Sequence, residues 1–491
     1  MVWGIAGQMA DYDLAIIGGG LTGAGIARDA AGRGLRVVLL EQGDLGSGAS
    51  SASASLIAGD LEQFERRALL RVRASLAERN VLARLAPHLV RPVKLVLPVH
   101  PQDRAAWRLR SELFVYDRLA PAGEFPRTAA LDLTHHPAGF SLKRSFSTAF
   151  AYAGALVDEA RLVILNAVDA AERGASIRTG ARCVRADRED EWRLGVIDRG
   201  YRRTITARAL VNATGAWVNR TAEVALRRAA PRAKLMRESR IVVRRPFDHD
   251  AIYVLRHTDD RLVFVSPYAD DFAVVGMIDN EYAGEPALAS PTAGEIAYLC
   301  AAASRYFREQ FAPTDVIRTI CSVRARSMQN PGGTLAFDRP FHEAPLVTVF
   351  GADTVMYRRR AEDVMALLAP FFAMRGPWTG TSPLAGGDLA ADLDEEVDRA
   401  RMRWRFLTDA HARRLICAHG TRITRILGDA NSLTDLGPLF GPDLTGAEVR
   451  YLMACEWVRT EEDVLMRRSK LALAISPQGR NALSDFIKAS A

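Results

Sequence analysis

The chain has 491 residues, 48% of them hydrophobic and 25% charged, which predicts a globular protein of two or three domains rather than one small core. Its formal net charge is +7, yet acidic and basic residues are interleaved along the chain. This balance favours anionic partners, such as phosphorylated substrates or acidic lipid headgroups. It argues against nucleic acid, because the sequence has no basic stripe with interleaved aromatic residues.

The first predicted unit along the chain is strand, glycine turn, helix and strand. A short apolar strand at 14–17 breaks into the letters GGGLTGAG, a small-residue helix continues over 26–32, and a second apolar strand at 35–40 ends on Glu41. This order within about thirty residues is the context that a dinucleotide fingerprint requires. The unit therefore predicts a bound dinucleotide, either FAD or NAD.

Each residue of this fingerprint has a physical task. Gly18 makes the tight turn, Gly20 lets the backbone approach the pyrophosphate, and Gly23 lets the helix pack closely on the strand. Free N–H groups and the dipole at the helix N-terminus hold the pyrophosphate. Glu41 can accept hydrogen bonds from a ribose diol.

The middle of the chain continues with helices and strands. We expect an amphipathic helix from 157 to 173 and one alternating strand from 175 to 185. An apolar strand at 209–212 then runs through Ala213 into a turn at Gly215. It is either an ordinary strand of an α/β unit or a return strand whose turn passes the cofactor again.

The remaining segments predict a second sheet and a helical end. Four β-type runs between 241 and 279 indicate an antiparallel cap sheet, and 346–350 forms one more buried strand before a helix. From 395 onward, apolar residues recur at three- and four-residue spacing, which predicts a helical C-terminal domain.

The cysteines and the hydropathy bear on the compartment. Five scattered cysteines never form CxxC, and the nine histidines show no ligand spacing, which predicts a reducing, cytoplasmic compartment with no disulfide framework and no metal site. No apolar run reaches the ~18 to 20 residues of a membrane span. The first residues also lack the basic segment of a signal peptide.

Motifs over nearly the whole chain resemble those of the FAD-dependent glycerol-3-phosphate dehydrogenases, the aerobic, quinone-linked enzymes of the cell membrane. The similar segments are DLAIIGGGLTGAGIARDAAGRGLRVVLLEQGDL, SLAERNVLARLAPHLVRP, LVDEARLVILNA, LVNATGAWV, SLTDLGPLFG and CEWVRTEEDVLMRRSK. The resemblance implies an α/β protein, α+β overall. Its parts would be a glutathione-reductase-like Rossmann domain for FAD, an antiparallel β substrate cap and a helical C-terminal domain.

The resemblance also places the domains and the cofactor contacts. The expected domains are an FAD-binding domain of residues 11–75, 150–230 and 315–380, a substrate cap of residues 76–149 and 231–314, and a C-terminal helical domain of residues 388–491. The residues expected to bind FAD are Gly18, Gly20, Gly23, Glu41, Ser50, Ser51, Ala213, Gly215 and Gly351.

The reaction that the resemblance implies is a hydride transfer. The C2 hydride of sn-glycerol 3-phosphate passes to flavin N5, the hydroxyl proton leaves to a base, and dihydroxyacetone phosphate forms. Electrons then go to quinone, which implies a protein attached peripherally to the inner face of the bacterial membrane, with a homodimer as the expected assembly. The chemistry needs cations for the phosphate, a proton acceptor and positive charge near the flavin.

The sequence departs from the family pattern on the substrate side. In the stretch SSASASLIAGDLEQFE, the family's Lys, His, second Gly, Arg and Tyr are replaced by Ser55, Ala58, Asp60, Glu62 and Gln63. Further on, a lysine near the flavin becomes Asp353, and the family's GTTD becomes Gly276-Met277-Ile278-Asp279. A glycine becomes Glu238 and a histidine becomes Arg240, whereas the arginine of the GVRP motif survives as Arg324.

These departures leave three functions open. The first is a glycerol-3-phosphate dehydrogenase with a remodelled pocket, in which Arg324, helped by Arg240, anchors the phosphate and the family's histidine base is lost at Ala58. In that case Arg326 and 358–360 could help to rebuild the anion site. The second is a flavin oxidoreductase for an amine or an uncharged alcohol, since the substitutions replace cations by neutral or acidic groups. The third is a catalytically inactive FAD-binding homologue.

Overall fold

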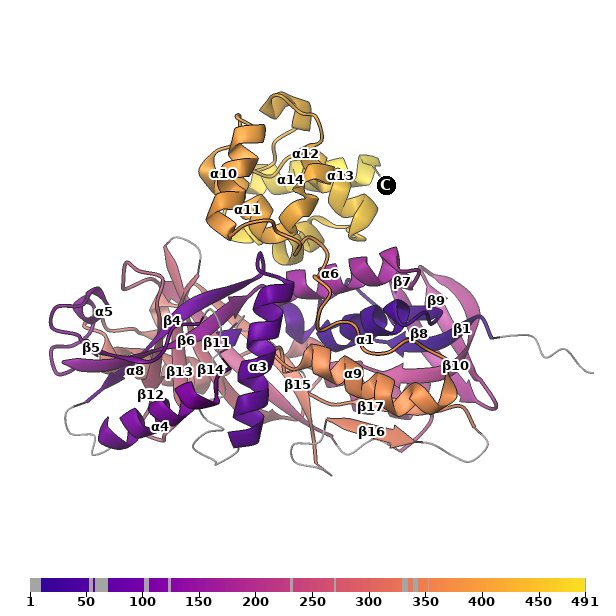
Figure 1. The fold of residues 1–491 in the computed structure, drawn as a ribbon, viewed down its shortest axis with the longest axis horizontal. Coiled ribbons are helices and arrows are strands. Elements are labelled where there is room, and N and C mark those ends of the chain that lie inside the picture. Colours follow the sequence, from indigo (N-terminus) through magenta and orange to yellow (C-terminus); the bar gives the residue numbers. More distant parts are fainter. Residues whose placement is uncertain are drawn as a thin grey trace, which may run out of the picture.

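The protein forms two sheets and a helical lobe that lies over them (Figure 1). The structure is a computed structural model, and it describes residues 10–52, 56–57, 69–100, 106–121, 125–229, 233–268, 271–328, 334–338, 343–351 and 353–490. We call the two sheets the parallel sheet and the second sheet, and we call residues 393–490 the C-terminal lobe.

The parallel sheet contains the glycine turn. Its parallel strands are, in spatial order, β17 (Leu346–Val349), β10 (Tyr201–Asn212), β1 (Tyr12–Ile17), β2 (Val37–Glu41) and β7 (Ser176–Thr179). Strand β16 (Leu335–Asp338) pairs antiparallel with β17, and β8 (Ala181–Arg188) and β9 (Trp192–Asp198) form a meander that leads into β10.

This sheet is covered on both faces, which explains why its strands are continuous apolar runs. On one face, Leu14 and Ile16 pack against α1 (Leu21–Gly32), α6 (Glu159–Glu172) and α9 (Tyr357–Leu368). On the other face, Ala15 and Ile17 pack against the meander. The predicted strands and helices of the first unit are confirmed within a few residues.

One predicted element is wrong. The segment 175–185 is not a single strand, because the chain breaks at Gly180 between β7 and β8. Gly180 has a φ of +69°, which favours glycine, and its N–H donates to the carbonyl oxygen of Gly43, 3.0 Å away. β7 therefore ends the parallel sheet, and β8 starts the meander.

The second sheet is antiparallel except for one pair, β4 with β12. Its strands are, in spatial order, β15 (Arg318–Ser327), β11 (Ala233–Arg244), β14 (Phe272–Tyr282), β13 (Leu262–Tyr268), β12 (Ile252–Arg256), β4 (Val90–Val99), β6 (Thr148–Val157) and β3 (Leu56–Ile57), with β5 (Ala129–Asp132) also paired to β6. The runs predicted between 241 and 279 form four of these strands.

Alternate residues of these strands pack on opposite layers. Leu95 and Leu97 pack with α3 (Leu69–Leu85) and α4 (Ala106–Leu119) on one face. Val96 packs with α8 (Ala293–Tyr306) and the short α5 (Pro137–Phe140) on the other. Because α8 occupies that face, the face of β11, β14 and β15 opposite α8 is the one left for a ligand.

The C-terminal lobe is helical and has a core of its own. Its helices are α10 (Leu393–Arg403), α11 (Asp409–His419), α12 (Ile423–Leu427), α13 (Gly446–Cys455) and α14 (Pro477–Ser490). Three of them begin at residues whose side chains accept a backbone N–H, namely Asp392, Thr408 and Thr445. Leu415, Leu452 and Leu483 lie in the core between them.

The connection between α9 and α10 is fixed by an aromatic ring. The ring of Trp378 contacts the guanidinium groups of Arg28 and Arg173, whose Cζ atoms are 4.8 and 4.0 Å from its ring centre. Its indole N–H donates to the carbonyl oxygen of Asp29, 3.1 Å away. These contacts hold the chain against α1 and α6 before it enters the C-terminal lobe.

None of the helices in the described part of the chain is long and apolar enough to span a bilayer.

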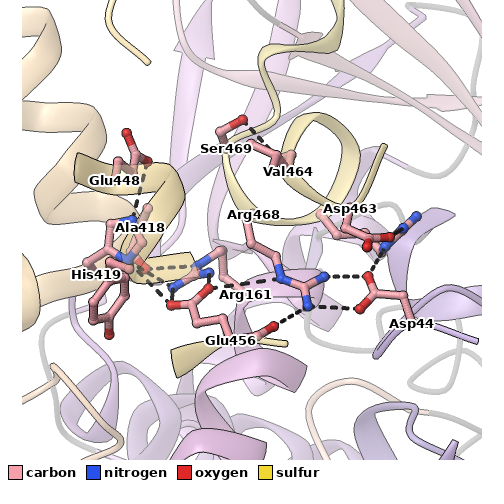
Figure 2. A network of polar contacts seen from close by, with 12 residues as sticks. Asp44, Arg161, Ala418, His419, Glu448, Glu456, Asp463, Val464, Arg468 and Ser469 are labelled. Atoms are coloured by element: carbon pink, nitrogen blue, oxygen red, sulfur yellow. Dashed lines mark hydrogen bonds and ion pairs between the residues drawn. The ribbon is translucent and has the colours of Figure 1, made fainter. Parts of the chain in front are cut away.

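The C-terminal lobe joins α6 through buried charges (Figure 2). Arg161 of α6 forms two hydrogen bonds to the carboxylate of Glu456 and one to the carbonyl oxygen of Ala418. Its Nη2 also lies 3.2 Å from Nδ1 of His419. Arg161, His419 and Glu456 are almost inaccessible to solvent, so the loss of any one leaves an unpaired buried charge or polar group.

A histidine lies beside this joint without a partner of its own. His88, in the turn before β4, is buried, and neither of its ring nitrogens has a hydrogen-bond partner in the described part of the chain. Burial, together with the nearby charge of Arg161, lowers the pKa of His88 to about 3. An unfolded histidine has a pKa of about 6.5, so below that pH unfolding is accompanied by uptake of a proton at His88. The contribution of neutral His88 to the free energy of unfolding is therefore fully present above that pH and is lost as the pH falls toward 3.

We therefore expect His88→Leu to flatten the acid dependence of stability. The free energy of unfolding, measured by urea titration at several pH values from 6 to 4, should change by about 1.4 kcal/mol less per pH unit than in the original protein, because one fewer proton is taken up on unfolding. Leu288→Gln, an exposed substitution that removes no titratable group, provides the control and should leave the slope unchanged. An unaltered slope in His88→Leu would contradict the prediction.

Candidate active site

The glycine turn lies at the carboxyl end of β1. Gly18 has a φ of +109°, and a Cβ there would lie 2.5 Å from the carbonyl oxygen of Ala213. A Cβ at Gly23 would overlap the carbonyl oxygen of Gly18, so the helix and the turn meet without room for a side chain. At Gly20, in contrast, a Cβ would approach only Ser50 Oγ, at 3.9 Å. The three glycines thus have the close packing and the open space that the sequence pattern predicts for them.

Helix α1 begins at this turn without a side-chain cap and without an acidic residue in its first turn. The N–H of Leu21 donates to Ser50 Oγ, 3.3 Å away, which ties α1 to the short 3-10 helix η1 (Ala49–Ala52). An uncapped helix N-terminus facing open space is a site for a phosphate or pyrophosphate group.

Glu41 lies at the end of β2 beside the same turn. Its carboxylate accepts hydrogen bonds from the N–H groups of Gly19, at 2.7 Å, and Gly43, at 2.8 Å. Burial raises the pKa of Glu41, although these two N–H groups act in the opposite direction. The carboxylate is therefore held in one orientation at the strand end, as a ribose-binding acid requires.

The other predicted cofactor residues lie on two turns and one strand end. Ser50 and Ser51 belong to η1, and Gly215 begins the 3-10 helix η2 (Gly215–Trp217) just after Ala213, whose N–H donates to the carbonyl oxygen of Ile17. Both η1 and η2 contact β15 of the second sheet. Gly351 follows β17, and a Cβ there would lie 3.5 Å from the carbonyl oxygen of Ala325 on the same β15. The structure thus brings these residues together between the two sheets.

These features fit FAD. The uncapped N-terminus of α1 suits the pyrophosphate, and Glu41 suits the ribose. No heavy atom lies within 4 Å of the Cβ position of Gly215, apart from its own neighbours, so the second turn also leaves room for a ligand.

The two predicted substrate arginines lie on neighbouring strands of the second sheet. Arg240 of β11 and Arg324 of β15 both pair with Glu238, at 2.9 and 3.6 Å respectively. Nη2 of Arg324 also donates to Oδ2 of Asp279 on β14. Two cations and two carboxylates therefore form one cluster with no net charge.

The two arginines differ in accessibility. The side chain of Arg324 is 38% exposed, whereas that of Arg240 is only 2% exposed. Burial lowers the pKa of Arg324, but the carboxylates of Glu238 and Asp279 more than offset this effect, so the pKa is raised and the guanidinium stays charged. Arg324 is thus the cation that can reach a ligand.

A β-bulge shapes this cluster. The pairing of β11 with β14 shifts at Ser239 and Arg240, and the extra residue on β14 is Met277, with a φ of +83°. A Cβ on the neighbouring Gly276 would overlap the side chain of Arg240. The bulge and the glycine make room for Arg240 between the strands, at the cost of a strained conformation at Met277.

The amino-acid sequence matches the family of FAD dependent oxidoreductases over residues 13–355 and the C-terminal domain of alpha-glycerophosphate oxidase over residues 378–491. A glycerol-3-phosphate dehydrogenase of Pseudomonas aeruginosa is 39% identical over 490 residues, which covers 97% of this chain and 95% of that protein. The chain belongs to the family of FAD-dependent glycerol-3-phosphate dehydrogenases. The family and the cofactor predicted from the sequence motifs are thereby confirmed, and FAD rather than NAD is the bound dinucleotide.

Two further similarities frame this family assignment. A D-erythritol 1-phosphate dehydrogenase of Brucella abortus is 38% identical over 487 residues, covering 96% of this chain and 97% of that protein. The crystal structure of the glycerol-3-phosphate dehydrogenase from Bacillus halodurans, complexed with FAD, matches with a TM-score of 0.73 at 22% identity, covering 99% of this chain and 90% of that one. This likeness confirms the predicted α/β fold with a helical C-terminal domain.

The position of the family's flavin-side lysine is described in the structure. Asp353 precedes α9, and its carboxylate lies 3.9 Å from a guanidinium nitrogen of Arg71 on α3. Arg360, in the first turn of α9, is buried nearby, and the charge of Asp353 partly offsets the lowering of its pKa by burial. The loss of the lysine is thus accompanied by two arginines around the new carboxylate, of which Arg71 was not predicted from the sequence.

The remaining predicted positions lie either outside the described residues or away from the cluster around Arg324. Ser55, Ala58, Asp60, Glu62 and Gln63 lie outside the described residues. Arg358 pairs with Glu78 and Glu362 in the interior, which occupies its guanidinium, and Arg326 is exposed on β15. Neither lies in the cluster around Arg324.

The contrast between Gly20 and Gly23 gives a test of the cofactor turn. We expect Gly23→Ala to destabilise the FAD-free protein by several degrees in Tm, because the added methyl group overlaps a carbonyl oxygen. Gly20→Ala should leave that Tm within about 2 degrees and still weaken FAD binding about tenfold or more, since its methyl group fills only ligand space. Thermal unfolding of the apoprotein and fluorescence titration with FAD measure the two effects. Equal effects of both variants on the apoprotein would contradict this assignment.

Proposed function

We propose that this family member oxidises a secondary alcohol of a small polyol phosphate to the ketone. The observation that carries the proposal is the partly exposed Arg324 on the strand that contacts both flavin-side turns. The two relatives described above are named for phosphate esters of glycerol and of erythritol. A partly exposed guanidinium on this strand is the group that such an ester needs, because it binds phosphate by charge-assisted hydrogen bonds.

In this proposal, different residues bind the phosphate, accept the proton and hold the cofactor. Arg324 binds the phosphate, and buried Arg240 supports it through their shared partner Glu238. We assign the hydroxyl proton of the substrate to the carboxylate of Asp279, whose buried Oδ1 has no hydrogen-bond partner in the described part of the chain and could accept from a donor that reaches it. FAD, when bound, supplies the acceptor for the hydride. The turns at Ser50, Ser51, Ala213, Gly215 and Gly351 form its binding site together with the glycine turn and Glu41.

A remodelled pocket has a physical consequence for the substrate. Glu238 and Asp279 neutralise the two arginines, and Asp353 adds a third carboxylate near Arg71 and Arg360. Such a pocket binds a phosphate less tightly than one with unpaired cations, and it favours a substrate whose other end donates hydrogen bonds, as a polyol does.

The same carboxylates favour a second candidate, an amine or an uncharged alcohol. A cationic amine would pair with Glu238 or Asp279, and Arg324 would then keep these carboxylates ionised rather than bind the substrate. The two candidates differ in whether Arg324 is needed for affinity.

We expect glycerol 3-phosphate or D-erythritol 1-phosphate to bleach the flavin absorbance of the purified protein in the absence of oxygen. Arg324→Met should lower kcat/KM about 10- to 100-fold, mostly through KM, because one charge-assisted contact to the phosphate is lost. Arg326→Met, an exposed arginine on the same strand, is the matched control and should change kcat/KM less than about twofold. Bleaching by amines or uncharged alcohols alone would favour the second candidate, and no bleaching by any of these compounds would indicate the inactive homologue.

The proposal extends to the membrane surface and to quinone as the electron acceptor. Trp107, Arg110, Phe114 and Arg118 recur along α4 at spacings that place them on one side of the helix. Trp107 is 74% exposed and Phe114 is 59% exposed, and the exposed Leu70 lies in the first turn of the neighbouring α3. Exposed aromatic and basic side chains on one helix suit binding to an anionic lipid surface at the inner face of the bacterial membrane. Homodimer formation remains part of the proposal.

Vesicle binding tests this surface. The purified protein should co-sediment with vesicles that contain anionic phosphatidylglycerol, and Trp107→Ser combined with Phe114→Ser should reduce the bound fraction at least about fivefold, because two inserted side chains are lost. Leu288→Ser removes a side chain of similar exposure from another part of the chain and should bind normally. Undiminished binding of the double variant would exclude α4 as the membrane contact.

A further inference from the structure

The loop that follows β2 supports the glycine turn directly. Glu41, at its start, accepts a hydrogen bond from the N–H of Gly19, and Gly46, near its end, donates to the carbonyl oxygen of the same Gly19 at 2.9 Å. Residues 41–46 therefore hold both backbone polar groups of Gly19, the residue that precedes Gly20. Any shift of this loop moves the backbone that faces the pyrophosphate and the carboxylate that faces the ribose.

The middle of this loop is held by the C-terminal lobe (Figure 2). The carboxylate of Asp44 accepts hydrogen bonds from Nε of Arg467 and from both terminal nitrogens of Arg468, one of them at 2.8 Å. The side chain of Asp44 is 10% exposed and that of Arg468 is not exposed at all. Two adjacent arginines of the C-terminal lobe thus surround one carboxylate of residues 41–46, which we call the cofactor loop.

Both arginines belong to a single π-helical turn, η9 (Asp463–Arg468). This wider turn, in which the N–H of Ser469 donates to the carbonyl oxygen of Val464, brings Arg467 and Arg468 to the same partner. Asp463 holds Arg467 from within the turn and accepts N–H groups from the preceding segment. The turn is consequently fixed in the lobe before it meets Asp44.

The contact is continuous with the buried joint at α6. Arg468 donates to the carbonyl oxygen of Glu456, whose carboxylate pairs with Arg161. The charges of this region balance, with the carboxylates Asp44, Glu456 and Asp463 opposite the guanidinium groups of Arg161, Arg467 and Arg468. Withdrawal of the lobe would remove these partners from Asp44 and Arg161 at the same time.

We infer that Arg467 and Arg468 are positioning residues for FAD, through which the C-terminal lobe holds the cofactor loop in its binding conformation. FAD binding and docking of the lobe then stabilise each other, because each is favoured by the same placement of residues 41–46. Linkage requires this coupling to be reciprocal: a docked lobe tightens FAD binding, and bound FAD tightens docking to the same degree. This role of the two arginines at the cofactor site is independent of the identity of the substrate.

Hydrogen exchange of the unaltered protein tests the coupling in one direction. Amides of residues 456–469 should exchange about tenfold more slowly in the FAD-loaded protein than in the apoprotein, although the segment lies on the lobe side of the joint. Amides of α14, which belongs to the same lobe and makes none of these contacts, provide the internal control and should not change. Equal protection of residues 456–469 with and without FAD would overturn the inference.

Substitution of the carboxylate tests the other direction. Asp44→Asn keeps the shape of the side chain and removes its charge, and we expect the dissociation constant for FAD, from fluorescence titration of the apoprotein, to rise about tenfold. Arg468→Lys, which retains the charge and loses the fork, should have a smaller effect in the same direction. Arg413→Ala breaks an exposed ion pair with Asp394 within the lobe and is the matched control, with an expected change below about twofold. A folded Asp44→Asn protein that binds FAD as tightly as the original would show that these arginines only attach the lobe.

Discussion

The organisation of this protein depends on how closely α1 can approach the end of β1. The missing side chain at Gly23 lets the helix rest on the carbonyl oxygen of Gly18, and the positive φ of Gly18 turns the chain under Ala213. This contact aims the uncapped N-terminus of α1 at the space between the two sheets. Glu41, η1, η2 and β15 are arranged around that space, so the cofactor site follows from the packing of one helix on one turn.

Across the cofactor site from the glycine turn, the second sheet carries arginines and carboxylates whose charges neutralise one another. Arg324 and Arg240 share Glu238, and Arg324 also holds Asp279. A cluster of this kind keeps its arginines charged and oriented. Its carboxylates also neutralise part of the positive charge, so the arginines attract an anionic ligand less strongly. The site can therefore keep a geometry that suits a phosphate group, while Glu238 and Asp279 lower its affinity for that group. The bulge at Met277 shows that the strands deviate from regular pairing to make room for this cluster.

The sequence predicts the parallel sheet and the helical lobe well, because apolar periodicity and the glycine pattern are local signals. It fails at Gly180, where one turn residue separates two strands that share an alternating pattern. The close packing at Gly18 and Gly23 and the position of Glu41 were predictable because these residues belong to one strand–turn–helix unit. The sequence shows acidic residues at positions 238 and 279, but it does not show that they pair with Arg324. That pairing depends on β11, β14 and β15, which are distant in sequence and meet only in the folded sheet. Arg71 and the contact of Asp44 with Arg467 and Arg468 carry no local signal, because ion pairs between domains depend on how the domains dock.

The joint between α6 and the C-terminal lobe also has a consequence for how the protein responds to heat. It contains several buried ion pairs, with Arg161 and Glu456 at its centre. The cost of removing charges from water falls as temperature rises, whereas the hydrophobic contribution per unit area levels off. On warming, the ion pairs that attach the lobe should therefore lose less of their stabilising effect than the hydrophobic cores do. We expect thermal unfolding to begin within one of these cores and not by separation of the C-terminal lobe from the rest of the protein.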